Sequence, residues 1–133
     1  QLYNALLGSE QKVSNSIAEF THDSSLGMII PQSSLLAHDD NNMLFNHERV
    51  QFTSKKIGVP FINDVFPTGS MFWFRPGAML PLLKLEEHDF ELEYGYSDGT
   101  IAHAVERLFV TVTKATGHYI SKTEANVACA TAG

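Results

Sequence analysis

The sequence predicts an α/β fold, in which a small mixed or parallel sheet is flanked by helices. Three observations favour it. The apolar run "LGMIIP" at 26–31 is short and continuous, which is typical of a buried strand. Between residues 101 and 112 apolar side chains recur at helical spacing. Helical and extended patterns alternate along 133 residues, which predicts parallel connections within a single domain or a fragment of one.

The amino-terminal half is predicted to contain more helix than strand. Ser9 is placed to cap one helix, Asn46 to cap another, and Gly58 to end the second. The predicted elements are the end of a helix at 2–7, a helix at 10–20, a strand at 26–31, a loop at 32–42 and a helix at 46–57.

The carboxyl-terminal half is predicted to begin with an aromatic strand from about 70 to 75. Alternation along "GSMFWFRP" places Met71, Trp73 and Arg75 on one face, and Pro76 opens a short helix. The remaining predicted elements are a loop rich in acids and aromatics at 84–97, a helix from Asp98 to Gly117, a strand at 118–121 and a flexible tail at 121–133.

Composition narrows the classes of function. The net charge is −6 and the pI about 5.4, which argues against a nucleic-acid partner because phosphate binding needs a basic surface. The sequence contains no run of 18 or more apolar residues, so it predicts no transmembrane helix. The single cysteine, Cys129, excludes a disulfide framework and fits a reducing compartment. Because residue 1 is glutamine, we expect the chain to begin inside a longer protein.

Asp98 is the main candidate for catalysis. It precedes Gly99 and a helix, and a carboxylate at a helix N-terminus is held ionised and directed by free N–H groups, as a general base requires. The same position fits an ordinary helix cap, and the residues alone leave both interpretations open. On the following helix, His103 lies off the apolar stripe and its role stays open, and Glu106 is interpreted as part of a solvated face with local ion pairs.

Two other clusters of polar residues give weaker indications of a functional site. "EEHD" at 86–89 contains metal-ligand residue types, but neighbours in sequence rarely converge on one ion, so no metal site is assigned. "HDD" at 38–40 is interpreted as a solvated loop. The sequence contains no HExxH, no GxSxG and no glycine-rich phosphate loop.

Two motifs together, "GSMFWFRPGAM" at 69–79 and "DGTIAHAVERLF" at 98–109, resemble the rhamnan synthesis protein F family of bacterial polysaccharide biosynthesis. The loop residues Asp89, Phe90, Glu93 and Gly95 resemble it too, as does the start of the chain from "LYNALLGSEQKV" to "LGMIIP". The resemblance covers residues 2–120. It implies the acceptor-side, carboxyl-terminal half of a GT-A-like (Rossmann-like) glycosyltransferase domain, a rhamnosyltransferase that builds cell-surface polysaccharide. A half that binds the nucleotide and a divalent metal is expected upstream of this chain.

The resemblance also implies roles for individual residues. Asp98 is expected to act as general base on the acceptor hydroxyl, with a nucleotide-sugar donor such as dTDP-rhamnose. The residues expected to bind substrate are Trp73, Arg75, Tyr94, Tyr96, His103 and Arg107. The acceptor is expected to be a polysaccharide or a lipid-linked glycan. The location implied is the cytoplasm, at the inner face of the plasma membrane through peripheral association of the full protein.

Two other functions stay open. A non-catalytic glycan-binding or protein-interaction module would bind through Trp73, Phe74, Tyr94 and Tyr96. A small metal hydrolase would use His88, Asp89 and Asp98.

Overall fold

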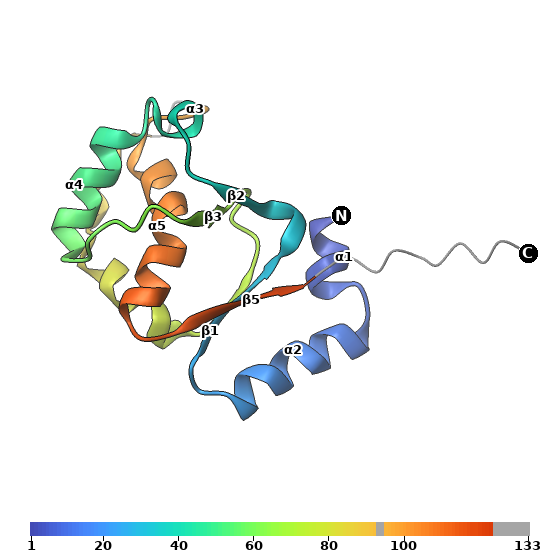
Figure 1. Cartoon of the computed structure of the whole chain (residues 1–133). Coiled ribbons are helices and arrows are strands. Elements are labelled where there is room, and N and C mark those ends of the chain that lie inside the picture. Colours follow the sequence, from blue (N-terminus) through green and yellow to red (C-terminus); the bar gives the residue numbers. More distant parts are fainter. Residues whose placement is uncertain (93–94, 124–133) are drawn as a thin grey trace, which may run out of the picture.

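The computed structural model describes residues 1–92 and 95–123, and it confirms a mixed α/β fold with small mixed sheets and helices (Figure 1). The helices are α1 (Leu2–Leu7), α2 (Glu10–His22), α3 (Asp40–Met43), α4 (His47–Ile57) and α5 (Ile101–Ala115). The strands are β1 (Leu26–Pro31), β2 (Leu35–Ala37), β3 (Val65–Pro67), β4 (Trp73–Phe74) and β5 (Tyr119–Thr123). The 3-10 helices are η1 (Gln32–Ser34), η2 (Pro76–Lys84) and η3 (Glu87–Asp89).

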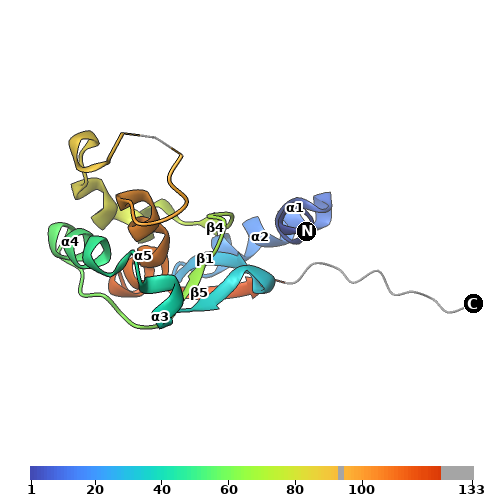
Figure 2. The same cartoon turned by 90° about the horizontal axis from the view of Figure 1, so that it is seen from above.

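Strand β1 is the centre of the main sheet. It pairs with β4 antiparallel, with Met28 opposite Phe74, and with β5 parallel, with Leu26 opposite Tyr119. Helices α1 and α2 lie on one side of β1, and α5 on the other (Figures 1 and 2). All six residues of β1 are buried, because both faces of the strand are covered. This explains why its sequence is a continuous apolar run rather than an alternating one.

Helix α5 provides much of the core. Its predicted apolar stripe is confirmed, since Ile101, Ala104, Leu108 and Val112 are all buried. The stripe packs with residues of β1, α4 and η2 in one cluster. At Gly27 the helix approaches β1 so closely that an added Cβ would lie 2.5 Å from a methyl carbon of Thr113. The C-terminal part of α5 is therefore packed tightly against the sheet.

Several predicted boundaries are confirmed. Ser9 caps α2 by accepting a hydrogen bond from the Lys12 N–H. Gly58 ends α4 in the left-handed conformation, with φ 71°. Pro76 opens η2, and Gly117, with φ 83°, follows the end of α5.

Other boundaries were wrong. The strand predicted at 70–75 is reduced to Trp73–Phe74, because Gly69 and Ser70 both have positive φ and form a turn. Strand β5 extends to Thr123, so residues 121–123 belong to the sheet and not to a tail. The loop predicted at 32–42 contains β2, which pairs antiparallel with β3. Strands of three residues are too short to show a periodic pattern.

Among residues 1–92 and 95–123, no helix has the length and apolar character that a bilayer span requires.

Candidate active site at the start of α5

Asp98 lines a pocket between α4 and the loop that leads into α5. The pocket has a volume of about 270 Å³. Its lining residues are Arg49, Glu91, Leu92, Tyr96, Asp98, Gly99 and Thr100. Acidic, basic and apolar side chains from two elements far apart in the sequence therefore meet in one hollow.

The prediction that Asp98 caps the helix was wrong. Helix α5 begins at Ile101, and its cap is Thr100, whose hydroxyl accepts a hydrogen bond from the His103 N–H. The His103 ring completes the cap, with Nδ1 2.7 Å from the Thr100 hydroxyl oxygen. The Asp98 side chain therefore makes no capping hydrogen bond, and the His103 side chain is part of the cap of α5.

The loop beside Asp98 is held by a buried amide. Asn46 is fully buried, and its Oδ1 accepts a hydrogen bond of 3.1 Å from the Gly99 N–H. Its Nδ2 donates to the carbonyl of Asn42 at 2.9 Å. Asn46 is the N-cap residue of α4 as predicted, but its side chain makes no capping hydrogen bond and instead fixes the position of the α5 loop.

Glu91 ties the same loop to α4. Its Oε2 accepts from the first amide of α5, that of Ile101, at 2.9 Å, and its Oε1 pairs with Nε of Arg49 at 2.9 Å. Burial raises the pKa of Glu91, but the hydrogen bond from Ile101 and the charge of Arg49 outweigh it. The net result is a pKa below the ordinary value, so Glu91 stays ionised across the neutral range.

Arg107 forms an ion pair with the Asp98 carboxylate. Its Nη2 lies 3.6 Å from Oδ1 of Asp98, and that oxygen is buried without a hydrogen-bond partner in the described part of the chain. The Asp98 side chain is 30% exposed, so the accessible part of the carboxylate is on the side of Oδ2. One oxygen faces a cation and the other is open to a ligand.

Arg107 itself is a buried support. Its side chain is 7% exposed, and its guanidinium donates to the carbonyls of Asn42 and His103. It also pairs with Glu106 at 3.3 Å and lies over the ring of Phe66. Arg107, predicted to bind substrate, therefore touches Asp98 and the backbone around it. Its position suits it to orient Asp98.

Glu106 links this support to the β3–β4 turn. Its Oε2 accepts hydrogen bonds from the Gly69 N–H at 3.1 Å and from the Ser70 hydroxyl at 3.2 Å. The interpretation of Glu106 as a solvated face was incomplete, because the carboxylate stabilises a turn across the molecule as well as pairing locally.

Two more predicted substrate residues, Trp73 and Arg75, lie elsewhere. They line a hollow of about 380 Å³ against α2, which shares no lining residue with the Asp98 pocket. The Arg75 guanidinium donates to the carbonyls of Leu26, Phe20 and Asp23, and Trp73 Nε1 donates to the carbonyl of Leu6. The structure therefore sets Trp73 and Arg75 apart from Asp98, whereas the resemblance implied one substrate site for all three.

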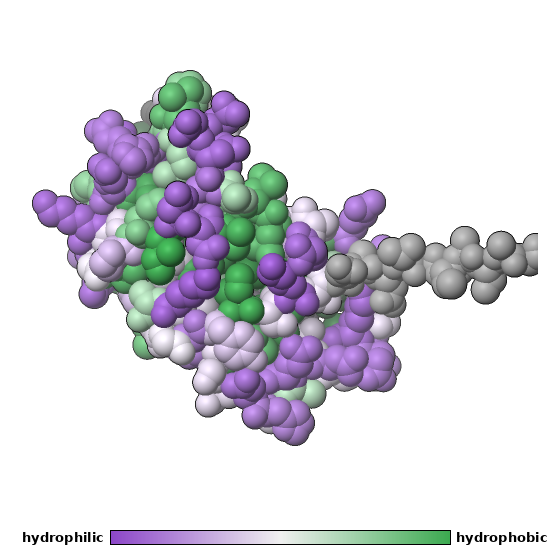
Figure 3. All heavy atoms as spheres, viewed as in Figure 1, coloured by the Kyte–Doolittle hydropathy of each residue, from purple (hydrophilic) through white to green (hydrophobic). Residues whose placement is uncertain are grey.

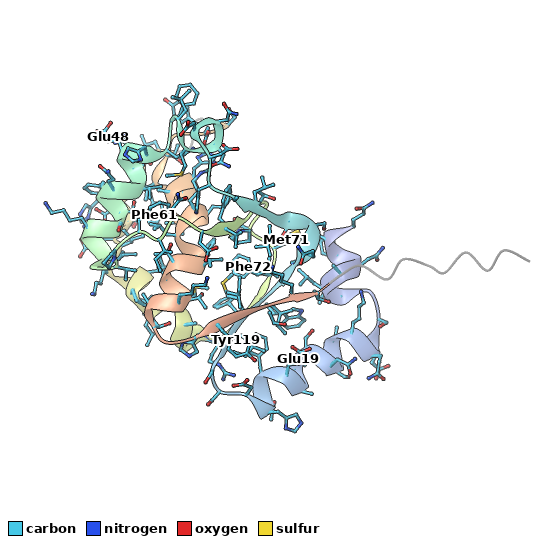
Figure 4. All side chains as sticks on the ribbon, in the orientation of Figure 1. Glu19, Glu48, Phe61, Met71, Phe72 and Tyr119 are labelled. Carbon is cyan, nitrogen blue, oxygen red and sulfur yellow. The ribbon has the colours of Figure 1, made fainter. Side chains whose placement is uncertain are left out.

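The strand packs against the core through the face that the alternation sets opposite Trp73. Phe72, and not Trp73, packs against α5, with its ring centroid 4.8 Å from that of Phe109 (Figure 4). Tyr96 lines the Asp98 pocket as expected. Tyr94 lies outside the described residues.

The acidic clusters have structural partners. Asp89 pairs with Lys56 at 2.7 Å, and the hydrogen bond from Lys56 holds the pKa of Asp89 below its usual value. Asp39 caps α3, and His38 stacks on Phe66. In the part of the chain that the structure describes, no three histidine, cysteine or acidic residues form a group able to hold a metal, so His88, Asp89 and Asp98 do not converge as a metal hydrolase requires.

Sequence reasoning missed Arg49, Asn46 and Glu91. Arg49 and Glu91 are 42 residues apart, and Asn46 and Gly99 are 53 apart. Neither pair produces a periodic or spacing signal, so only the fold brings them to the pocket.

Comparison with known proteins adds independent findings. The sequence model of the family described as rhamnan synthesis protein F matches residues 1–118. Curated relatives in two strains of Xanthomonas campestris pv. campestris, B100 and ATCC 33913, are each called "Uncharacterized protein WxcX". Each is 34% identical over 128 residues, which are 93% of this chain and 18% of the relative, so the chain spans less than a fifth of their length. No solved structure matches.

Proposed function

The chain belongs to the rhamnan synthesis protein F family of polysaccharide biosynthesis, and we propose that it supplies the acceptor side of a GT-A-like glycosyltransferase. The reaction we propose is transfer of a deoxysugar, such as rhamnose from dTDP-rhamnose, to a growing polysaccharide or lipid-linked glycan at the inner face of the plasma membrane. A longer polypeptide would supply the donor site.

One observation carries the proposal. Asp98 stands in a pocket at the start of a rigid helix, with Oδ1 turned to Arg107 and the other side of the carboxylate accessible. A general base needs this arrangement, because its free oxygen must reach the proton that it removes.

The proposed step is an inverting displacement. Asp98 takes the proton of an acceptor hydroxyl while the oxygen forms a bond to the anomeric carbon of the donor. The bond from that carbon to the nucleoside diphosphate breaks, and its electron pair leaves with the diphosphate. We assign the site of any divalent metal to the part of the longer polypeptide that supplies the donor site.

The test is Asp98→Asn in the full-length protein. The amide keeps the shape of the side chain but cannot accept the proton, so turnover should fall by a factor of about 10² to 10⁴. The matched control is Asp40→Asn, an exposed acid on α3 outside the pocket, which should leave turnover unchanged. Near-normal turnover of the Asp98 variant, with both variants folded, would show that Asp98 is not the base.

A second candidate is a non-catalytic module that binds glycan or protein. The hollow against α2 favours it, because Phe74 and Ile17 line that hollow and are each about half exposed. Hydrophobic residues also reach the surface in the middle of the face shown in Figure 3. If Phe74→Ala abolishes assembly or glycan binding while Asp98→Asn has no effect, the module replaces the enzyme as the explanation.

A further inference from the structure

Arg49 is a residue to which the proposed reaction does not yet give a role. We propose that Arg49 binds the acceptor, donating hydrogen bonds to hydroxyl oxygens beside the hydroxyl that Asp98 deprotonates, and that the pocket takes one electrically neutral sugar residue. This inference rests on the proposed function and names the ligand of the same pocket.

The first argument is the free hydrogen-bonding capacity of Arg49. Its Nε is held by Glu91 at 2.9 Å, which fixes the plane of the guanidinium. Neither terminal nitrogen has a hydrogen-bond partner in residues 1–92 and 95–123, and the side chain is 42% exposed where it lines the pocket. A guanidinium held at one nitrogen presents its remaining N–H groups in a fixed fork, which suits two neighbouring oxygens.

The second argument is charge. Among the described residues, the charged side chains that line or support the pocket are two arginines, Arg49 and Arg107, and three carboxylates, those of Glu91, Asp98 and Glu106. Each cation already faces a carboxylate, so a phosphate or a uronic acid would meet no uncompensated positive charge. A neutral ligand with hydroxyl groups meets a donor at Arg49 and an acceptor at Asp98.

The third argument is size and surface. A volume of about 270 Å³ lies just below the roughly 300–1,000 Å³ typical of sites for drug-sized ligands, so it suits a single sugar ring. Leu92 and Tyr96 line the same pocket and are 73% and 59% exposed. They offer an apolar surface to the C–H face of a sugar, while Arg49 and Asp98 take its hydroxyl edge.

The kinetic test compares Arg49→Met, Arg49→Lys and the control Lys55→Met in the full-length protein. Lys55 is an exposed cation on the same helix that does not line the pocket. We expect Arg49→Met to raise the KM for the acceptor about tenfold or more and to change kcat little, because a charge-assisted hydrogen bond to a substrate is lost. Arg49→Lys should recover only part of the loss, since the ammonium keeps the charge but not the fork. An unchanged acceptor KM in Arg49→Met would overturn the inference.

A binding measurement separates this inference from the proposed reaction. Methyl α-L-rhamnoside is titrated into the full-length Asp98→Asn protein, with and without Arg49→Met, and binding is followed by saturation-transfer NMR. We expect Arg49→Met to abolish or strongly weaken the signal and inorganic phosphate not to compete. Equal binding without Arg49, or displacement of the sugar by phosphate, would refute the inference while leaving Asp98 as a base. Normal turnover of Asp98→Asn together with Arg49-dependent binding would instead refute the proposed reaction and leave a sugar-binding pocket.

Discussion

The α5 end and the α2 end of the molecule both place an arginine against backbone carbonyls, but among the described residues only the arginine of the α5 end, Arg107, forms ion pairs with carboxylates. Arg75 donates to the carbonyls of Phe20 and Asp23 at the C-terminal end of α2, where the helix dipole favours a cation. Arg107 donates to carbonyls too, but it also faces Asp98. Both arginines belong to distinctive motifs, but their interactions differ because the fold places different groups beside them: carbonyls beside Arg75, and carbonyls and carboxylates beside Arg107.

The two ends also differ in packing. Helix α5 buries a full stripe of side chains, whereas no residue of α2 is buried. The Asp98 pocket is therefore built on the rigid part of the molecule, as a catalytic site requires. The hollow around Trp73 is bordered by the loosely packed part.

The largest expected effect tests this difference in packing. Leu108→Ala in α5 should destabilise the protein by about 3 kcal/mol, because it leaves a cavity at a fully buried position. Ile17→Ala in α2, where the side chain is 53% exposed, should cost less than about 1 kcal/mol. Urea unfolding of both variants measures the two values, and similar losses would mean that α2 is packed as tightly as α5.

The next effect concerns the buried guanidinium at the α5 end. Arg107→Met should destabilise the protein by about 3 kcal/mol, because Asp98 and Glu106 lose their buried partner. It should also lower turnover, since Asp98 loses the contact that orients it. If stability falls but turnover per folded molecule is unchanged, Arg107 has no role in orienting Asp98.

A smaller effect is expected at the α2 end. Arg75→Met removes hydrogen bonds to three carbonyls and should cost about 2 kcal/mol, with the C-terminal turn of α2 affected first. Hydrogen exchange should show faster exchange at the end of α2 than in α5. The acceptor KM should not change, and a rise in it would place Arg75 in the substrate site after all.

The smallest effect is a dependence of stability on pH. Burial, and then the charge of Arg107, lower the pKa of His38, while Asp64 and the Arg107 backbone oppose the shift. The unfolded chain therefore binds a proton more readily than the folded protein, and stability should fall as the pH drops below about 6.5 towards 5. His38→Phe should weaken this dependence in thermal unfolding measured at pH 7.5 and 5.5. An unchanged dependence would assign it to other groups.

Much of the fold could be predicted because local patterns determine it. Strand β1 and the stripe of α5 follow from apolar spacing, and the ends at Ser9 and Gly58 follow from cap chemistry. The β2–β3 pair could not be predicted, because its strands are three residues long. The aromatic strand was predicted too long, because a turn held by Glu106 interrupts it and Glu106 is more than 30 residues away.

The candidate site divides in the same way. Asp98 and Tyr96 could be picked out because they belong to one loop directly before a helix. Arg49 and Asn46 could not, since they reach that loop only when α4 packs beside α5. Trp73 and Arg75 were placed in the site because the family resemblance implied it, and the antiparallel pairing of β4 with β1 puts them against α2 instead.

The sequence by itself determined the fold class, the helix boundaries that depend on caps, the family and the identity of Asp98 as a candidate, since each depends on residues close together in the chain. Only the tertiary structure decided which residues surround Asp98, because the contacts at the pocket join α4, the 91–100 loop and α5 across tens of residues. It also decided that Arg107 supports Asp98 while Arg75 holds α2. A guanidinium binds whichever carbonyl or carboxylate the packing of the chain brings within reach.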